Sequence, residues 1–206
     1  MGRGALASMR TKSILALELR DLAPRQGEII DVDPRQVAGS LNSRAIEMAR
    51  RMCGHLDGVV VDGDWDLHAT FEPFTEKLAY LACHMRWVEG RAWEDTELFQ
   101  LYAGRIGRGE PCRFKAYGEL VDRYRALDGV FEQVRREGGL SERPEHLVRM
   151  SVARDGRILW GRNGRHRVAV ALIAGVRTMP AKVGYVHRNA VSHFQTLRRA
   201  HPRAAG

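Results

Sequence analysis

A glycine-rich basic turn in the C-terminal third of the sequence has the residue types of an anion-binding site. It follows a predicted strand that ends at Trp160, and it opens a predicted helix. Glycine permits the sharp reversal between the two at no steric cost. The first amides of the helix point outward with the positive end of the helix dipole behind them, which favours a bound anion. The residues of this turn that we expect near the anion are Gly161, Gly164, Arg165, His166 and Arg167.

The side chains of this turn support the same prediction. Arg165, His166 and Arg167 place positive charge in the first helical turn, where it is unfavourable unless a negative group lies beside it. A bound phosphate removes that conflict. The competing interpretation is a glycine turn whose arginines point into water. The turn matches neither the P-loop pattern GxxxxGK[ST] nor the dinucleotide pattern GxGxxG.

A second candidate site is the acidic run DGDWD, which contains Asp62, Asp64 and Asp66. On an extended backbone these alternating carboxylates would share one face. Mg²⁺ that accompanies a nucleotide takes one or two such carboxylates, so we predict these three residues as metal ligands and Asp64 also as a catalytic carboxylate. The alternative is an ordinary acidic turn after a strand. A calcium loop is excluded because Leu67 stands where such a loop needs glycine.

Glu89 is the second candidate catalytic residue. It lies in a helical segment, and it would act as a general base toward a substrate hydroxyl if that segment folds over the phosphate site. A purely structural alternative assigns Asp95 or Thr96 to a helix N-cap and Trp93 to a packing anchor. The histidines show no metal-binding spacing such as HExxH.

The periodicity of apolar residues predicts an α+β fold with a helical insertion. A hairpin is indicated over 146–160 by Asp155-Gly156 at its bend, and Gly175 predicts the end of the following helix. The predicted strands are 27–34, 58–62, the two arms of the hairpin and 179–187. The predicted helices are 35–53, 71–88, 95–106, 116–136 and 164–174.

Composition favours an anionic partner. The 206 residues include 33 Lys and Arg against 25 Asp and Glu, a net charge of +8, with the basic excess in 135–203 and an acidic stretch in 56–99. The three cysteines are widely spaced, which argues against disulfides or a zinc site. The apolar runs are far shorter than the roughly 20 residues of a membrane helix. We therefore expect a cytoplasmic protein without a membrane partner.

One stretch carries a resemblance to a known family. DGRILWGRNGRHRVAVALIAGVRTMPAKV (155–183) resembles the core of the ParB/sulfiredoxin superfamily, and EIIDVDP (28–34) resembles its first strand. The likeness covers 147–186 well and 28–62 loosely, and it makes 66–140 an insertion. It implies a small mixed sheet and a turn that binds nucleotide, here ATP or CTP. By this resemblance Gly164, Arg165, His166 and Arg167 would hold the phosphates.

Two activities of that superfamily are not supported. Arg165 stands where sulfiredoxins have their catalytic cysteine, so reduction of cysteine sulfinic acid is not expected. About twenty residues follow Val186, which we expect to be too few for the helix-turn-helix domain of partition proteins. What remains is the phosphate-binding core.

We expect a flexible leader over 1–12, one ParB/sulfiredoxin-like domain over 13–186 and a basic tail over 187–206. We interpret the tail as a solvated terminus, and the alternative is a basic amphipathic helix that touches nucleic acid. The function predicted is nucleotide or phosphate binding, with Mg²⁺-dependent phosphoryl transfer to a small molecule as the candidate reaction. The alternative is a nucleic-acid-binding protein or nuclease that uses the same turn on a backbone phosphate. An enclosed pocket roofed by 66–110 would favour the small molecule, and a basic stripe from 161–167 across the tail would favour nucleic acid.

Overall fold

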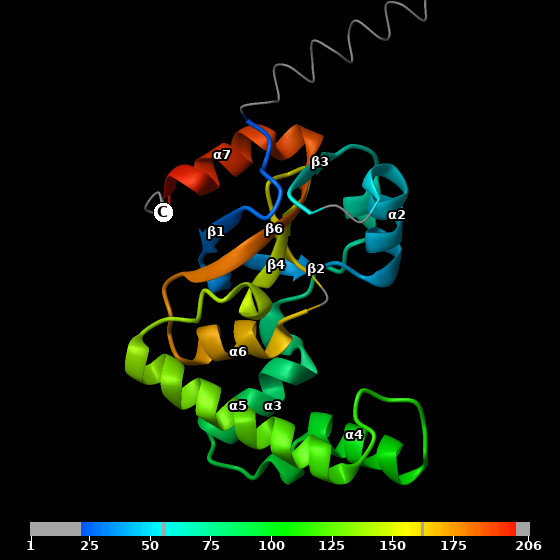
Figure 1. Ribbon diagram of the computed structural model, residues 1–206, viewed down its shortest axis with the longest axis vertical. Coiled ribbons are helices and arrows are strands. Elements are labelled where there is room, and N and C mark those ends of the chain that lie inside the picture. The colour runs from blue at the N-terminus through cyan, green and yellow to red at the C-terminus, as the bar shows by residue number, and fades with distance from the viewer. Residues whose placement is uncertain (1–21, 55–56, 162, 201–206) are drawn as a thin grey trace, which may run out of the picture.

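One mixed sheet organises the chain, which is seen in a computed structural model that describes residues 22–54, 57–161 and 163–200 (Figure 1). Within these residues the sheet has six strands: five follow the order β1-β6-β4-β5-β2, and the sixth, β3, pairs with the end of β6. Strand β6 pairs with three others, antiparallel to β1 and parallel to β3 and β4. The strands are β1 (Ile29–Val32), β2 (Val37–Ser40), β3 (Val59–Val61), β4 (Val148–Val152), β5 (Ile158–Trp160) and β6 (Met179–His187).

Helices cover the sheet and extend away from it. Helix α7 lies over β1 and β6, whereas α6 lies on the other side, between the sheet and a block made by α3, α4 and α5 (Figure 1). The helices are α2 (Ser43–Cys53), α3 (Leu78–Trp87), α4 (Glu97–Gly107), α5 (Tyr117–Glu137), α6 (Arg165–Ile173) and α7 (Val191–Ala200). Short 3₁₀ turns are η1 (Pro34–Gln36), η2 (Trp65–His68), η3 (Phe74–Glu76), η4 (Trp93–Asp95), η5 (Pro144–His146) and η6 (Arg188–Ala190). None of these described helices combines the length and apolar character needed to cross a bilayer.

The sequence of β6 explains why it forms the centre of the sheet. Every residue of MPAKVGYVH except Lys182 is buried. A strand covered on both faces needs such a nearly continuous apolar run, in contrast to the alternation of a half-exposed strand. The prediction of an α+β fold with a mixed sheet is confirmed.

The predicted hairpin and helix C-cap are also present. Strands β4 and β5 pair antiparallel, and Gly156 at their bend has φ +85°. Gly175 ends α6 with φ +69°. In both places a positive φ favours glycine, which is why the turns were visible in the sequence.

Two predicted helices begin later than expected. The first part of the predicted helix 35–53 is a strand instead, because residues 37–40 form β2 and pair parallel with β5. Helix α2 begins at Ser43, after the Asn42 side chain caps it by accepting from the Ala45 amide at 2.9 Å. The spacing of Val37 and Leu41 fits both the helical and the strand period, so pairing with the distant strand β5 determines that this segment is a strand. The predicted helix 71–88 begins at Leu78, because the segment after Pro73 forms η3 instead.

The C-terminal segment is part of the fold, so the prediction of a solvated tail from 187 is wrong for its described part. His187 is the last residue of β6 and is buried. Helix α7 buries Val191, Phe194 and Leu197 against β1 and β6. The predicted leader and residues 201–206 lie outside the described residues.

The predicted insertion forms a helical block with its own aromatic core. The Trp87 and Phe131 rings stack with centroids 4.2 Å apart. The Asp128 carboxylate accepts from the Trp87 indole at 2.8 Å, from the Trp93 indole at 3.1 Å and from Arg86 Nη2 at 2.9 Å. These bonds tie α3 and η4 to α5, and α3 and α5 in turn pack against α6. The block is therefore placed beside the helix that carries the predicted anion site.

Candidate anion-binding site

The basic turn is fixed to the sheet on both sides. The Gly161 amide donates to the Arg149 carbonyl at 2.8 Å, which continues the pairing of β5 with β4. The Trp160 indole donates to the Asn163 carbonyl at 2.7 Å and closes the turn from within. These two hydrogen bonds fix where the following helix begins relative to β4 and β5.

Gly164 begins the helix in a conformation that only glycine adopts easily. Its φ is +85°, and a Cβ there would lie 2.9 Å from Val148 Cγ2. The Arg167 amide donates the first helical hydrogen bond to the Gly164 carbonyl at 2.9 Å. The amides of Arg165 and His166 precede that bond, so they have no acceptor inside the helix and are available to an anion.

The start of α6 lines a cavity of about 800 Å³ whose wall is dominated by arginine. We call it the arginine pocket. The described arginines that line it come from α2, the segment after α4, β4, α5 and α6, and are Arg50, Arg113, Arg123, Arg149, Arg165 and Arg167. Among the described residues, Glu145 is the carboxylate on its wall.

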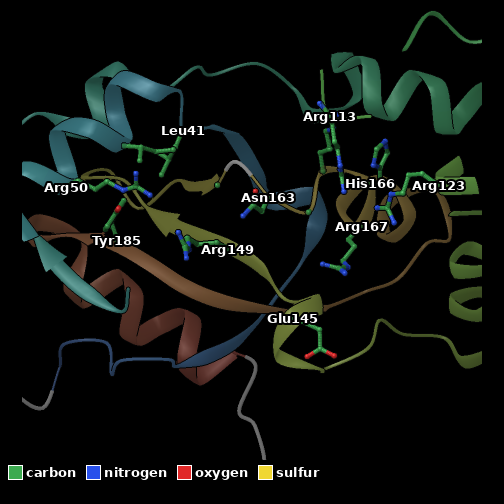
Figure 2. Close-up of a pocket in the computed structure, with 14 residues that line it drawn as sticks. Leu41, Arg50, Arg113, Arg123, Glu145, Arg149, Asn163, His166, Arg167 and Tyr185 are labelled. Carbon is green, nitrogen blue, oxygen red and sulfur yellow. The ribbon is translucent and has the colours of Figure 1, made fainter. Parts of the chain in front are cut away.

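The arginine pocket has two ends (Figure 2). Arg113, Arg123 and Arg167 gather around His166 at one end, beside α5 and α6. Arg50 lies at the other end against Tyr185, beside Leu41. Ile46 packs against the cluster that contains Leu41 and Tyr185 and adds apolar surface there. We call these the α6 end and the α2 end.

The two ends differ in how their arginines are paired. Arg149 Nη2 lies 2.7 Å from Asp57 Oδ2, and Lys182 Nζ lies 3.3 Å from the same oxygen. Arg50 lies beside Tyr185, whose hydroxyl is neutral. Arg165 of the α6 end likewise has only a neutral partner, because its Nη2 donates to the Tyr102 hydroxyl. Four described arginines and one carboxylate, Glu145, line the α6 end, so the larger excess of positive charge is there.

The electrostatics of Arg123 and Arg167 reflect that imbalance. Burial and then the neighbouring Arg113 and Arg165 guanidinium groups lower the pKa of Arg123. Burial and then Arg123 lower the pKa of Arg167, and Glu145 opposes this only in part. The Nε of Arg123 is buried without a hydrogen-bond partner among the described residues. Both side chains would gain from a nearby anion.

His166 is neutral, which corrects the expectation that it adds positive charge. Its side chain lines the arginine pocket while the residue is only 6% exposed. Burial first, and then the charges of Arg165, Arg123 and Arg113, lower its pKa to about 3. Its Nε2 has no partner in the described part of the chain. It can therefore serve a ligand as a hydrogen-bonding group.

The three aspartates of DGDWD lie outside the arginine pocket and are bound by arginines. The backbone there is not extended, because Trp65–His68 forms η2. Asp66 is buried and accepts from Arg154 Nη2 at 2.8 Å, Asp64 accepts from the same atom at 2.8 Å, and Asp62 accepts from Arg188 at 3.1 Å. Burial alone would raise the pKa of Asp66, but the bonds from Arg154 outweigh it and hold the pKa low.

This arrangement does not fit Mg²⁺. Each carboxylate that was predicted as a ligand already has a guanidinium partner, which a metal ion would have to displace. Within the described ranges, no group of three or more His, Cys, Asp or Glu side chains converges as a metal site. Asp64, the predicted catalytic carboxylate, is one of these paired groups.

Glu89 is also outside the arginine pocket. It follows α3 and pairs with Arg91 Nε at 2.9 Å and with His84 Nδ1 at 3.2 Å, beside a separate shallow pocket between α3 and α4. The structural alternative for this segment is confirmed, since Thr96 Oγ1 accepts from the Phe99 amide as the α4 N-cap. The general-base role predicted for Glu89 has no support in this geometry.

The insertion and the sheet supply arginines that the sequence analysis missed: Arg50, Arg113, Arg123 and Arg149. For Arg123 a signal existed, because it lies beside the buried stripe of Leu120, Tyr124 and Leu127 and so must be partly buried. Arg113 lies in an irregular segment, where no periodicity marks its position.

No family model, curated protein or solved structure matches this chain. The ParB/sulfiredoxin resemblance thus stays a prediction from the sequence.

Proposed function

We propose that this protein binds a phosphorylated small molecule, most simply a nucleotide, in the arginine pocket. The observation that carries the proposal is that six described arginines line one pocket with Glu145, and that four of them, Arg113, Arg123, Arg165 and Arg167, lie around the start of α6. Like charges held together in a partly buried place oppose folding unless an anion compensates them. Helix amides and guanidinium groups are the groups that bind phosphate best.

The location of the arginines supports a small ligand over nucleic acid. The roof predicted from 66–110 is not formed, because no described residue of that range lines the pocket. Arg113 and Arg123, from later in the insertion, wall the pocket on one side instead (Figure 2). The volume of about 800 Å³ lies within the range of small-molecule sites. In contrast, Arg188 and Arg198 of the C-terminal segment are paired with Asp62 and Glu28. No continuous stripe of unpaired charge therefore joins 161–167 to the described part of that segment.

The ParB/sulfiredoxin resemblance supports the same proposal from the sequence. It implies phosphates on Gly164, Arg165, His166 and Arg167, which all line the arginine pocket, and it suggests ATP or CTP. The proposal covers binding and not a reaction, because Glu89 and Asp64 lie outside the pocket. Phosphoryl transfer there would depend on positioning and charge neutralisation by the arginines.

A thermal-shift and calorimetric comparison tests the proposal. ATP, CTP and inorganic pyrophosphate should stabilise the protein and the free nucleosides should not, since a ligand at 100 times its Kd stabilises by about 2.7 kcal/mol. Each ligand should be measured with and without Mg²⁺.

Two arginine variants supply the control. Arg167→Ala should abolish the shift, whereas Arg136→Ala on the exposed face of α5, with a side chain 73% exposed, should leave it unchanged. The proposal is wrong if no phosphorylated compound binds, or if the two variants bind equally well.

A further inference from the structure

We infer that the α6 end of the arginine pocket takes a terminal phosphoryl group end-on, and that it discriminates against a phosphate esterified on both sides. This inference rests on the proposed function and deepens it. The ligand class is then a phosphomonoester or a polyphosphate with a free end, and an internal phosphodiester is excluded.

The inference starts from the polar atoms that have no partner. In the described part of the chain, the buried side-chain nitrogens and oxygens without a hydrogen bond are Arg123 Nε, His166 Nε2 and the Tyr124 hydroxyl. Folded proteins satisfy nearly all such atoms, and each exception requires an explanation. Here all three exceptions lie in one cluster.

The contacts among these residues establish the cluster. Arg123 and Tyr124 are neighbours in α5, and the Tyr124 ring packs edge-on against the His166 ring with centroids 5.9 Å apart. The Arg123 charge lowers the pKa of both His166 and Tyr124, although burial is the larger influence on each and raises the pKa of Tyr124. Both Arg123 and His166 line the arginine pocket. The unsatisfied atoms of Arg123 and His166 therefore belong to the wall of its α6 end, and the Tyr124 hydroxyl belongs to a side chain that packs against His166 without lining the pocket itself.

All three atoms can act as donors at neutral pH. The guanidinium Nε and the phenol carry hydrogens, and the neutral imidazole donates in the tautomer protonated at Nε2. Arg123 and His166, together with Arg113, Arg167 and the first amides of α6, present donors to the pocket from α5, from α6 and from the segment between α4 and α5. A terminal phosphoryl group offers three non-bridging oxygens and up to two charges to such a set, whereas a diester offers two oxygens and one charge.

The burial of the cluster gives the direction of entry. His166 and Tyr124 are buried where α5 packs on α6, so a ligand chain could not continue past them into the protein. The rest of the ligand must extend the other way, toward the α2 end. There Arg149 is paired with Asp57, and Leu41, Ile46 and Tyr185 offer surface for an uncharged group.

The inference is tested with pairs of ligands, one with a free terminal phosphate (uncapped) and one whose terminal phosphate carries a methyl ester (capped). We would compare by calorimetry ATP with its γ-methyl ester, CTP with its γ-methyl ester, and pyrophosphate with its P,P′-dimethyl ester. The uncapped member of each binding pair should bind at least about tenfold more tightly, because a buried donor left without an acceptor is costly.

Three variants locate the effect. Arg123→Met, His166→Phe and Tyr124→Phe should each weaken uncapped binding and narrow the ratio between uncapped and capped ligand, and Tyr124→Phe removes a single oxygen with little risk to folding. Arg125→Met on the same helix, with a side chain 75% exposed, should leave the ratio unchanged.

The outcomes are separable. Equal binding of capped and uncapped ligands would overturn end-on recognition and leave phosphate binding standing. A large ratio that persists in all three folded variants would show that the terminal group is recognised elsewhere, which also overturns the inference. Failure of every uncapped compound to bind would overturn the proposed function itself.

Discussion

Arg123 illustrates at the scale of a single residue how a binding group reduces the stability of its own protein. Its guanidinium is partly buried, its Nε lacks a partner among the described residues, and Arg113 and Arg165 lie close enough to lower its pKa. We predict that Arg123→Met raises the free energy of unfolding of the ligand-free protein by about 1 kcal/mol and weakens phosphate binding. Urea denaturation and calorimetry measure the two effects.

The matched control for this prediction is Arg125→Met, two residues along α5. Its side chain forms an exposed ion pair with Asp122 at 3.4 Å, so the change should alter stability by less than about 0.5 kcal/mol and leave binding intact. A loss of stability in Arg123→Met would mean that Arg123 is primarily a packing residue.

His166 makes stability depend on pH in a known direction. Burial, followed by the neighbouring arginines, lowers its pKa in the folded protein to about 3 from 6.5. Between these values the unfolded chain takes up a proton that the folded protein does not, so this residue lowers the free energy of unfolding as pH falls below 6.5. The slope is at most about 1.4 kcal/mol per pH unit.

The substitution His166→Phe isolates that contribution. We predict that the stability of the variant falls less steeply between pH 7 and pH 4 than that of the wild type, as measured by urea denaturation at several pH values. The other titrating groups are common to both proteins and cancel in the difference. Parallel curves would show that His166 titrates normally.

At the scale of elements, the glycines at the two ends of α6 allow the effect of backbone strain to be distinguished from the effect of a displaced binding site. Gly164 and Gly175 both have positive φ, but an added Cβ meets Val148 only at Gly164 and nothing within 4 Å at Gly175. We predict that Gly175→Ala costs about 1 kcal/mol of stability without affecting binding. Gly164→Ala should cost more and also weaken phosphate binding, because the start of α6 must move away from Val148. Denaturation and calorimetry on both variants provide the comparison.

The elements that the sequence predicted well are those with local signals. The hairpin bend at Gly156 and the helix end at Gly175 are defined by adjacent residues, and the apolar run of β6 is continuous. Strand β2 was missed because its identity depends on β5, which lies about 120 positions further along the chain. Short apolar segments of this kind satisfy both helical and strand periods, and tertiary pairing decides between them.

At the scale of the whole molecule, the difference between local and distant contacts also explains how much of the candidate site could be predicted from the sequence. The turn from Gly161 to Arg167 is contiguous, so its residues were identified from the sequence alone. Arg113 and Arg123 reach it only because α5 packs on α6, which no local pattern reveals. The acidic run around Asp64 failed as a metal site for the converse reason, since Arg154 from a distant segment neutralises it.

Because the arginine pocket joins the insertion to the sheet, ligand binding should stabilise both. We predict that pyrophosphate or ATP slows amide hydrogen exchange in the first turn of α6, in α5 around Arg123 and in the segment that carries Arg113. Donors from these three segments would contact one ligand, so opening any of them would require its release. Helix α7, which packs on the other side of the sheet, is the internal control and should exchange at an unchanged rate (Figure 1). Protection confined to α6 would mean that the insertion arginines do not hold the ligand, and protection of α7 to the same extent would indicate only a general rise in stability.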